Sequence, residues 1–244
     1  SFDKDQEGLD KVYRDHYKAY FRIFSRCGLP AIAVGADSGM MGGKVSHEYM
    51  YLSPIGEDTI ITCKHCGYTA NRQVASFKKE YFKEEEKPLE KIVTPGAKTI
   101  DDLTALLNIE ARQTAKAVFM VGTFINDKTG EEKDKLIVAI IRGDMDVEES
   151  KLSNAAKANS IRPAHEEEIT ACGIVPGFGS PIGAKGDMIT IIDDSVAYSN
   201  NLVAGANEAG YHYLNTNYGR DYDGIIADIA SARDGYICPD CGEK

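Results

Sequence analysis

The sequence predicts an α+β fold with mixed sheets, and two observations lead to this prediction. Apolar residues recur at helical spacing in some segments and gather in short β-rich runs in others, and the two kinds of segment do not alternate regularly. A doubly wound fold needs strict alternation, so this order favours a mixed-sheet arrangement. The 244 residues, 43% of them hydrophobic, suffice for one large domain or two modest ones.

The first part of the chain is expected to form a helix and then short strands. Residues 8–27 carry apolar side chains every three or four positions and end at Gly28, a natural C-terminal cap. The charged, low-complexity stretch 78–92 is interpreted as a solvated linker or exposed helix, and it is the best candidate boundary. Strands are expected at 31–34, 47–52 and 59–62.

After Pro95 the pattern becomes that of a second, mixed domain. Thr99 followed by Asp102 is a helix-start signature, and this helix should run to about Leu107. Two β-rich runs joined by a loop at 126–130 indicate a hairpin. Further helices are expected at 147–157, at 164–172 and from about 201, and strands at 115–124, 135–142, 188–193, 196–199 and 211–215.

The charge balance restricts the class of partner. A net charge of −10 argues against a protein that coats nucleic acid by bulk charge, because phosphate neutralisation needs clustered Lys and Arg. It does not exclude a protein that handles one end of a nucleic acid. No apolar run approaches the roughly 18–20 residues of a membrane span, and positions 1–25 carry no signal segment, so we expect no membrane association and a cytoplasmic location.

Four of the six cysteines form two C-x-x-C-G pairs, a pattern typical of zinc knuckles. Gly after the second Cys permits the tight turn, and four thiolates satisfy a tetrahedral zinc ion. The alternatives are reduced thiols that never meet, or two redox pairs. Cys27 and Cys172 are interpreted as small buried hydrophobic residues. The expected zinc ligands are Cys63, Cys66, Cys238 and Cys241.

Several residues outside the cysteines could do chemistry, each with a plainer alternative. The Gly-rich segment 175–183 could offer backbone N–H groups to an anion or carbonyl oxygen, or simply connect two elements. Lys116 interrupts an apolar strand and is either solvent-facing or a cation for a phosphate or ester. His212 is either structural or able to position a ligand hydroxyl or move a proton.

Two further segments are candidate functional sites, and each also has a structural alternative. Asp193 and Asp194 end a strand, where at most one should face a given site and where capping or turn chemistry is the alternative role. The loop 37–48 is a substrate loop or a flexible connection. The sequence has no nucleophile elbow and no His-Glu-x-x-His, so nothing in it demands covalent catalysis.

Read together, these segments resemble a bacterial-type prolyl-tRNA synthetase over essentially the whole chain. The joint match is specific, whereas no single motif would be. The resemblance is based on these segments: Ser1-Phe2-Asp3, 20–24, Ala36-Asp37-Ser38-Gly39, Gly42-Gly43, Ser46-His47-Glu48, 67–71, Thr94–Ile100, Arg142-Gly143-Asp144, Gly177 with Pro181, and Ala204–Asn207.

The resemblance implies an architecture in which an editing domain is inserted into a class II synthetase core. Residues 1–77 would be part of the antiparallel-sheet core, 78–224 the mixed-sheet editing domain with surrounding helices, and 225–244 the return to the core with the second knuckle. The chain would be a fragment that does not aminoacylate by itself. ATP and magnesium would be needed only by the full-length parent, which is expected to be a homodimer.

The resemblance also implies a reaction. The inserted domain would hydrolyse mischarged alanyl-tRNA(Pro) with an activated water, receiving the tRNA(Pro) acceptor end, while the parent joins proline to that tRNA. The alternative is a module that binds a tRNA acceptor end without catalysis. By position, His47 and Glu48 would lie near the proline site of the core. The editing residues would be Lys116, Gly177, Gly179, Pro181, Asp193 and His212.

Overall fold

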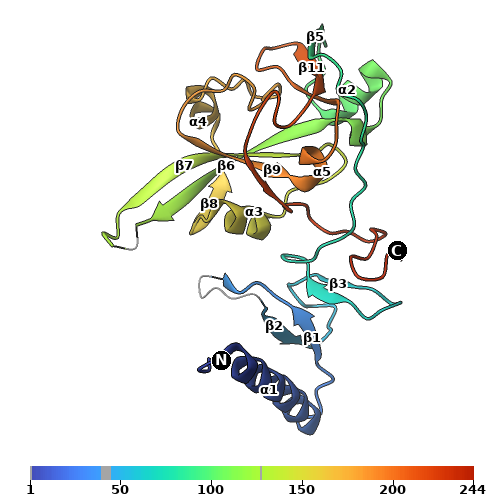
Figure 1. Cartoon of the computed structure of the whole chain (residues 1–244), viewed down its shortest axis with the longest axis vertical. Coiled ribbons are helices and arrows are strands. Elements are labelled where there is room, and N and C mark those ends of the chain that lie inside the picture. The colour runs from blue at the N-terminus through green and yellow to red at the C-terminus, as the bar shows by residue number, and fades with distance from the viewer. Residues whose placement is uncertain (1, 40–44, 127) are drawn as a thin grey trace. The chain divides into compact units, whose positions relative to one another are not determined.

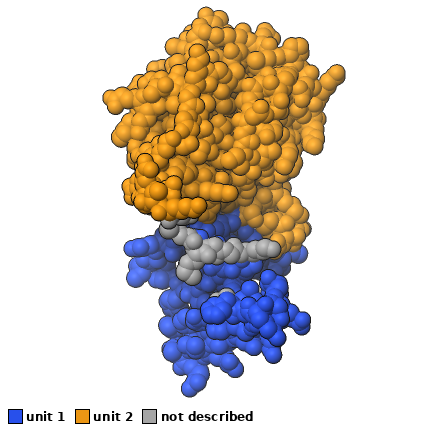
Figure 2. All heavy atoms as spheres, turned by 60° about the vertical axis from the view of Figure 1, so that its left-hand side comes forward, with its two compact units in different colours: residues 1–75 blue, residues 76–244 orange. Residues whose placement is uncertain are grey.

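The computed structural model describes residues 2–39, 45–126 and 128–244. The chain divides into two compact units, residues 1–75 and 76–244, which Figure 2 colours separately. Residues 225–244 belong to the second unit, and the three-part division drawn from the sequence stays a prediction. Ser1, the Gly42-Gly43 pair, the middle of the 37–48 loop and Asp127 lie outside the described residues.

The first unit is a long helix against a small sheet (Figure 1). The sheet order is β2-β1-β4-β3, with β1 and β4 parallel and the outer pairs antiparallel. Tyr49 of β2 packs edge-on against Phe21 of the helix, with ring centroids 5.3 Å apart. The elements are α1 (Gln6–Arg26), β1 (Ile32–Gly35), β2 (His47–Met50), β3 (Ile60–Thr62) and β4 (Thr69–Asn71).

The second unit contains two sheets and short helices, which confirms the predicted mixed-sheet α+β class. The larger sheet has the order β12-β9-β7-β6-β8 and is parallel at β12–β9–β7 but antiparallel at β7–β6–β8. The smaller, β10-β11-β5, is antiparallel. The strands are β5 (Glu90–Val93), β6 (Ala115–Ile125), β7 (Glu132–Arg142), β8 (Ser160–Pro163), β9 (Met188–Asp193), β10 (Leu202–Gly205), β11 (Tyr211–Thr216) and β12 (Ile225–Ala227).

Four α-helices and one 3-10 turn surround these sheets in the described part of the unit. The predicted cap of the first is confirmed, since Thr99 Oγ1 accepts from the Asp102 N–H at 3.1 Å and Asp102 accepts from the Thr99 N–H at 3.1 Å. The elements are α2 (Ile100–Leu107), the 3-10 turn η2 (Ala111–Gln113), α3 (Glu149–Ala156), α4 (Glu166–Ala171) and α5 (Asp194–Ala197).

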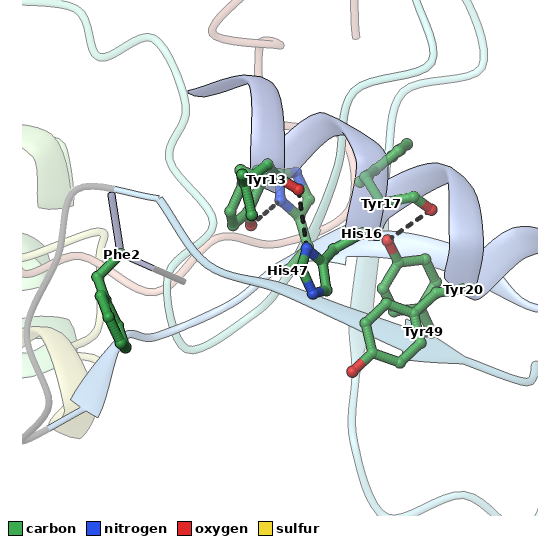
Figure 3. A pocket seen from close by; sticks show the side chains of 8 residues that line it. Phe2, Tyr13, His16, Tyr17, Tyr20, His47 and Tyr49 are labelled. Atoms are coloured by element: carbon green, nitrogen blue, oxygen red, sulfur yellow. Dashed lines mark hydrogen bonds between the residues drawn. The ribbon is translucent and has the colours of Figure 1, made fainter. Parts of the chain in front are cut away.

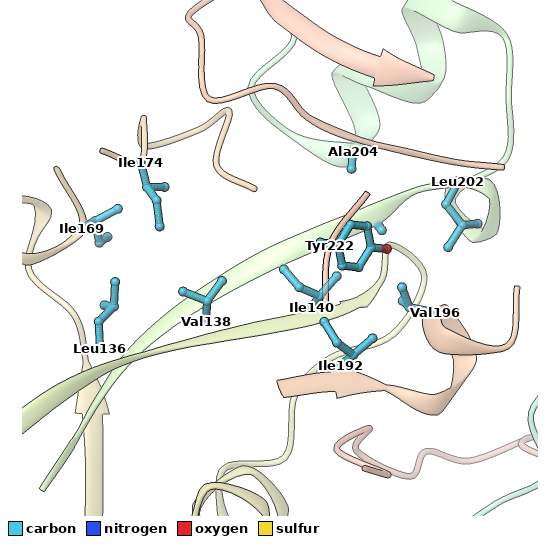
Figure 4. Packing of buried hydrophobic residues seen from close by; sticks show 11 residues of the cluster. Leu136, Val138, Ile140, Ile169, Ile174, Ile192, Val196, Leu202, Ala204 and Tyr222 are labelled. Carbon is cyan, nitrogen blue, oxygen red and sulfur yellow. The ribbon is translucent and has the colours of Figure 1, made fainter. Parts of the chain in front are cut away.

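The core of this unit lies on both faces of β7, because successive strand residues point to opposite faces. Leu136, Val138 and Ile140 pack in the cluster of Figure 4, which also holds Leu202 and Tyr222. Ile137 and Ala139 face the other way, toward the cluster that contains Leu152 of α3. β7 is therefore buried on both sides, which explains its continuous apolar run.

Two sequence predictions near residue 200 are wrong. Residues 196–199 are not a strand, because Asp193 caps α5 and starts a helical turn there. No helix starts near Asn201, whose φ is +60° and whose N–H donates to the Asn217 side chain at 2.9 Å. Leu202 to Gly205 pair with β11 instead, so side-chain hydrogen bonds decide the local conformation.

The charged stretch, residues 78–92, forms no helix, and only part of it is solvated as a linker would be. It runs as an extended segment along the second unit until β5 begins, and Phe82 exchanges hydrogen bonds with Ser199 Oγ at 3.2 Å and with the Asn200 N–H at 2.8 Å. Within it, the Lys79 side chain is only 2% exposed. The prediction of a buried Cys27 is also wrong, since this C-cap of α1 is exposed, while Cys172 is partly buried.

No helix among residues 2–39, 45–126 and 128–244 is both long enough and apolar enough to cross a bilayer.

Candidate functional site

A cavity of about 240 Å³ in the second unit brings together residues that are far apart in sequence. Four of the six predicted editing residues line it, namely Lys116, Gly177, Gly179 and His212. Its other lining residues are mostly apolar, and its charged lining groups in the described chain are Lys98 and Lys116. The lining is completed by Thr99, Ile100, Leu103, Ala115, Ala117, Phe119, Phe178 and Gly205.

Lys116 projects from β6 and is intermediate in exposure rather than fully solvent-facing. Its side chain is 25% exposed, and Nζ donates to Asp146 Oδ1 at 3.0 Å. Asp146 also forms an ion pair with Arg233, so one carboxylate is shared by two cations. Burial, with Arg233 nearby, lowers the pKa of Lys116 below its ordinary value. The ammonium is thus held by a carboxylate that it shares with Arg233.

The Gly-rich segment 175–183, here called the glycine loop, has glycines at positions where a side chain would be strained or would clash with neighbouring atoms. Gly177 has a φ of +82°, which favours glycine. A Cβ on Gly179 would lie 2.5 Å from the Phe119 ring. Asn207 fixes the loop by donating to the carbonyls of Ser180 and Ile182 and by accepting from the Ser180 N–H. The loop therefore has a fixed conformation.

Two backbone donors of this loop are available to a ligand. Within the described part of the chain, the N–H groups of Gly177 and Gly179 donate to no protein acceptor. Both residues line the cavity, whereas Pro181 does not. Paired N–H groups of this kind can bind a carbonyl oxygen or the oxyanion that forms from it.

His212 lies at the base of the same cavity on β11. It is 6% exposed, and its Nδ1 lies 2.7 Å from the hydroxyl of the buried Thr94. The Phe178 ring packs edge-on against the imidazole, with centroids 5.5 Å apart. Burial lowers the pKa of His212 below its ordinary value, so the ring is neutral at pH 7.

Asp193 is not among the residues that line the cavity. Its fully buried carboxylate accepts from Lys79 Nζ, from the N–H and hydroxyl of Ser195, and from the Ile229 N–H at 3.0 Å. Asp194 also contacts Lys79, because Asp194 starts α5 instead of continuing the strand to the opposite face. The capping role weighed for Asp193 is the one that the structure displays.

His47 and Glu48 point to opposite faces of β2 in the first unit. His47 lines a groove of about 490 Å³ with aromatic residues of α1, and its Nδ1 lies 2.8 Å from the Tyr13 hydroxyl (Figure 3). Glu48 is exposed and is not among the residues of that groove. Their placement at a proline site remains a prediction.

Each C-x-x-C-G pair forms a tight turn of the kind that holds a metal. The Gly67 N–H donates to the Cys63 carbonyl at 2.9 Å, and the Gly242 N–H donates to the Cys238 carbonyl at 3.1 Å. Both glycines have positive φ, +82° and +83°. Cys63 and Cys66 belong to the first unit and Cys238 and Cys241 to the second, and the zinc ion that all four are expected to share stays a prediction.

Sequence reasoning missed Thr94, Lys98 and Asp146. Thr94 bonds His212, Lys98 lies along Gly177, and Asp146 holds Lys116. Thr94 and Lys98 belong to the segment that carried the family resemblance, which was the one available signal for them. Asp146 is one of several acidic residues between positions 144 and 149, and only the fold places it beside Lys116.

Comparison with known proteins assigns the family. The model of the aminoacyl-tRNA editing domain matches residues 94–222, which include the whole cavity. This is more than half of the chain, and the chain therefore belongs to the aminoacyl-tRNA editing domain family. The resemblance seen in the sequence is confirmed.

The relatives are similar over the full length of the chain. The proline–tRNA ligase of Salinispora tropica is 46% identical over 246 residues, and that of Dehalococcoides mccartyi (strain 195) is 45% identical over 243. These alignments cover 100% and 99% of this chain but 41% of each relative. A solved structure, the hypothetical protein APE2540, aligns with 59% of this chain and 92% of its own at 13% identity and a TM-score of 0.47.

Proposed function

We propose that the cavity is an editing site that hydrolyses the ester of alanyl-tRNA(Pro). The observation that carries this proposal is that Lys116, Gly177, Gly179 and His212 line one cavity in a domain of the aminoacyl-tRNA editing family. An ester at the end of a tRNA offers what these groups bind, namely a carbonyl oxygen, ribose oxygens and phosphates.

The reaction needs no protein nucleophile. The one hydroxyl among the described lining residues belongs to Thr99, and it is used in the cap of α2. A water molecule would attack the ester carbonyl, the bond to the ribose oxygen would break, and that oxygen would take up the proton. Gly177 and Gly179 would stabilise the oxyanion with their N–H groups, and Lys116 would hold the ester region or the terminal phosphate.

The close packing of the cavity wall suits the selection of a small amino acid. Alanine lacks methylenes that proline has, and a proline pocket can reject it by only roughly 1–3 kcal/mol. A second site that admits alanine and excludes proline corrects the error. The apolar wall that includes Phe119 and Phe178 is closely packed, and we expect it to exclude the proline ring.

Replacing Lys116 with alanine tests this assignment. We expect deacylation of alanyl-tRNA(Pro) to fall about 10- to 100-fold, because a charged contact to the substrate is lost. Lys133→Ala is the matched control, since Lys133 is also a strand lysine paired with an aspartate, at 2.9 Å, but lies away from the cavity. Equal rates for wild type and Lys116→Ala would remove Lys116 from the site.

We infer that Cys63, Cys66, Cys238 and Cys241 bind zinc in a structural role. The two C-x-x-C-G turns support this, because four thiolates suit a tetrahedral zinc ion. Protein purified without chelator should contain about one zinc per chain by elemental analysis. Cys238→Ser should lower that content and the melting temperature. Protein without metal would contradict the proposal.

We infer that the longer protein containing this chain joins proline to tRNA(Pro) with ATP and magnesium. The similarity to proline–tRNA ligases supports this, although the chain spans about two fifths of their length. The same similarity supports a cytoplasmic location and a homodimeric parent. An ATP-dependent charging assay on the 244-residue chain should show no aminoacylation.

A further inference from the structure

Thr94 and His212 form a buried pair behind the cavity. Thr94 is 0% exposed, and its backbone N–H donates to the Gly210 carbonyl at 2.7 Å, just beyond the pairing of β5 with β11. Its Oγ1 lies 2.7 Å from His212 Nδ1. The backbone therefore holds the hydroxyl beside one particular nitrogen of the imidazole.

The direction of this hydrogen bond follows from counting protons. The hydroxyl has one hydrogen, and among the described residues Nδ1 of His212 is its sole acceptor. If Nδ1 carried a proton, that hydroxyl hydrogen would be buried without a partner, which is costly. The hydroxyl therefore donates, and Nδ1 accepts.

The other nitrogen must then carry the single proton of the neutral ring. Burial lowers the pKa of His212 below its ordinary value and keeps the imidazole neutral at pH 7. No hydrogen bond of Nε2 is made within the described part of the chain. Nε2–H is thus left for a ligand.

We propose that Thr94 is a positioning residue that fixes His212 as the Nε2–H tautomer, so that His212 donates a hydrogen bond to the substrate instead of acting as a base. That the substrate accepts this hydrogen bond rests on the proposed editing function. The accepting atom would be the ester carbonyl oxygen or a ribose oxygen of the aminoacyl end. The proton of the attacking water would go to the substrate rather than to His212.

Nitrogen-15 NMR of the histidine side chains tests the tautomer directly in the 244-residue chain without substrate. His212→Asn identifies the signals of His212. We expect Nε2 protonated and Nδ1 unprotonated in the wild type. A wild type with Nδ1 protonated would overturn the proposal, whatever the activity.

Two variants of Thr94 test the positioning role. Thr94→Val keeps the shape but removes the hydroxyl, and we expect a mixture of tautomers and a loss of about 5- to 10-fold in deacylation. Thr94→Ser restores the hydroxyl and should restore both readouts. An unchanged tautomer in folded Thr94→Val would overturn the proposal. A wild type with the expected tautomer but no deacylation would instead refute the proposed function and leave the tautomer assignment standing.

Discussion

Replacing Lys79 with methionine should destabilise the second unit more than any other single change proposed for this protein. Lys79 Nζ lies 2.9 Å from Asp193, 2.7 Å from Asp228 and in contact with Asp194. Burial alone would lower the pKa of Lys79, but Asp193 and Asp228 outweigh it and raise the pKa above its ordinary value. Without this cation, the fully buried carboxylate of Asp193 loses its cationic partner, which costs about 3–5 kcal/mol.

Urea unfolding measures this loss, and Lys83→Met is the matched control. Lys83 lies in the same extended segment but is exposed, so its replacement should change the free energy of unfolding by less than about 0.5 kcal/mol. In Lys79→Met the carboxylates would bind protons more readily when folded than when unfolded. The difference in the free energy of unfolding between wild type and Lys79→Met should therefore become smaller as the pH falls from 7 toward 5. A loss near that of the control, with no pH dependence, would disprove the buried network.

Replacing Gly205 with alanine should nearly abolish editing. Its Cβ would lie 2.3 Å from the Phe178 carbonyl oxygen and 2.5 Å from that of Gly179, so the glycine loop would have to move. A displacement of about 1 Å at a catalytic group can cost about 100-fold in rate, and we expect a loss of that size. The measurement is deacylation of alanyl-tRNA(Pro).

Gly35→Ala provides the matched control for this change. Gly35 also ends a strand, β1, but its added Cβ would meet atoms no closer than 3.6 Å, an ordinary van der Waals distance. We expect wild-type deacylation from it. Full activity in Gly205→Ala would mean that the backbone donors of the loop do not contribute to the reaction.

Local patterns predicted much of the fold. The amphipathic spacing of α1, the capping box at Thr99 and the long β6–β7 hairpin are all encoded by nearby residues, and all three are confirmed. The errors came from distant partners. In the sequence, Lys79 is one of many charged residues in the stretch 78–92, which was expected to be solvated. Only the fold places three aspartates around it.

The site was predicted less completely, for the same reason. The family resemblance indicated Lys116, Gly177, Gly179 and His212, which the fold brings to one cavity. It also indicated Asp193, whose carboxylate the structure shows bonded inside the unit. Thr94 could not be singled out, because its importance depends on a hydrogen bond to His212, which lies 118 residues away in sequence.

The most direct test of the editing function is deacylation by the wild-type 244-residue chain with two substrates. We predict that alanyl-tRNA(Pro) is hydrolysed at least about tenfold faster than its spontaneous decay, while prolyl-tRNA(Pro) decays at its spontaneous rate. Equal hydrolysis of both substrates would contradict the proposed selection by size. Binding of alanyl-tRNA(Pro) with no hydrolysis would show that the domain is a module that holds the acceptor end without catalysis.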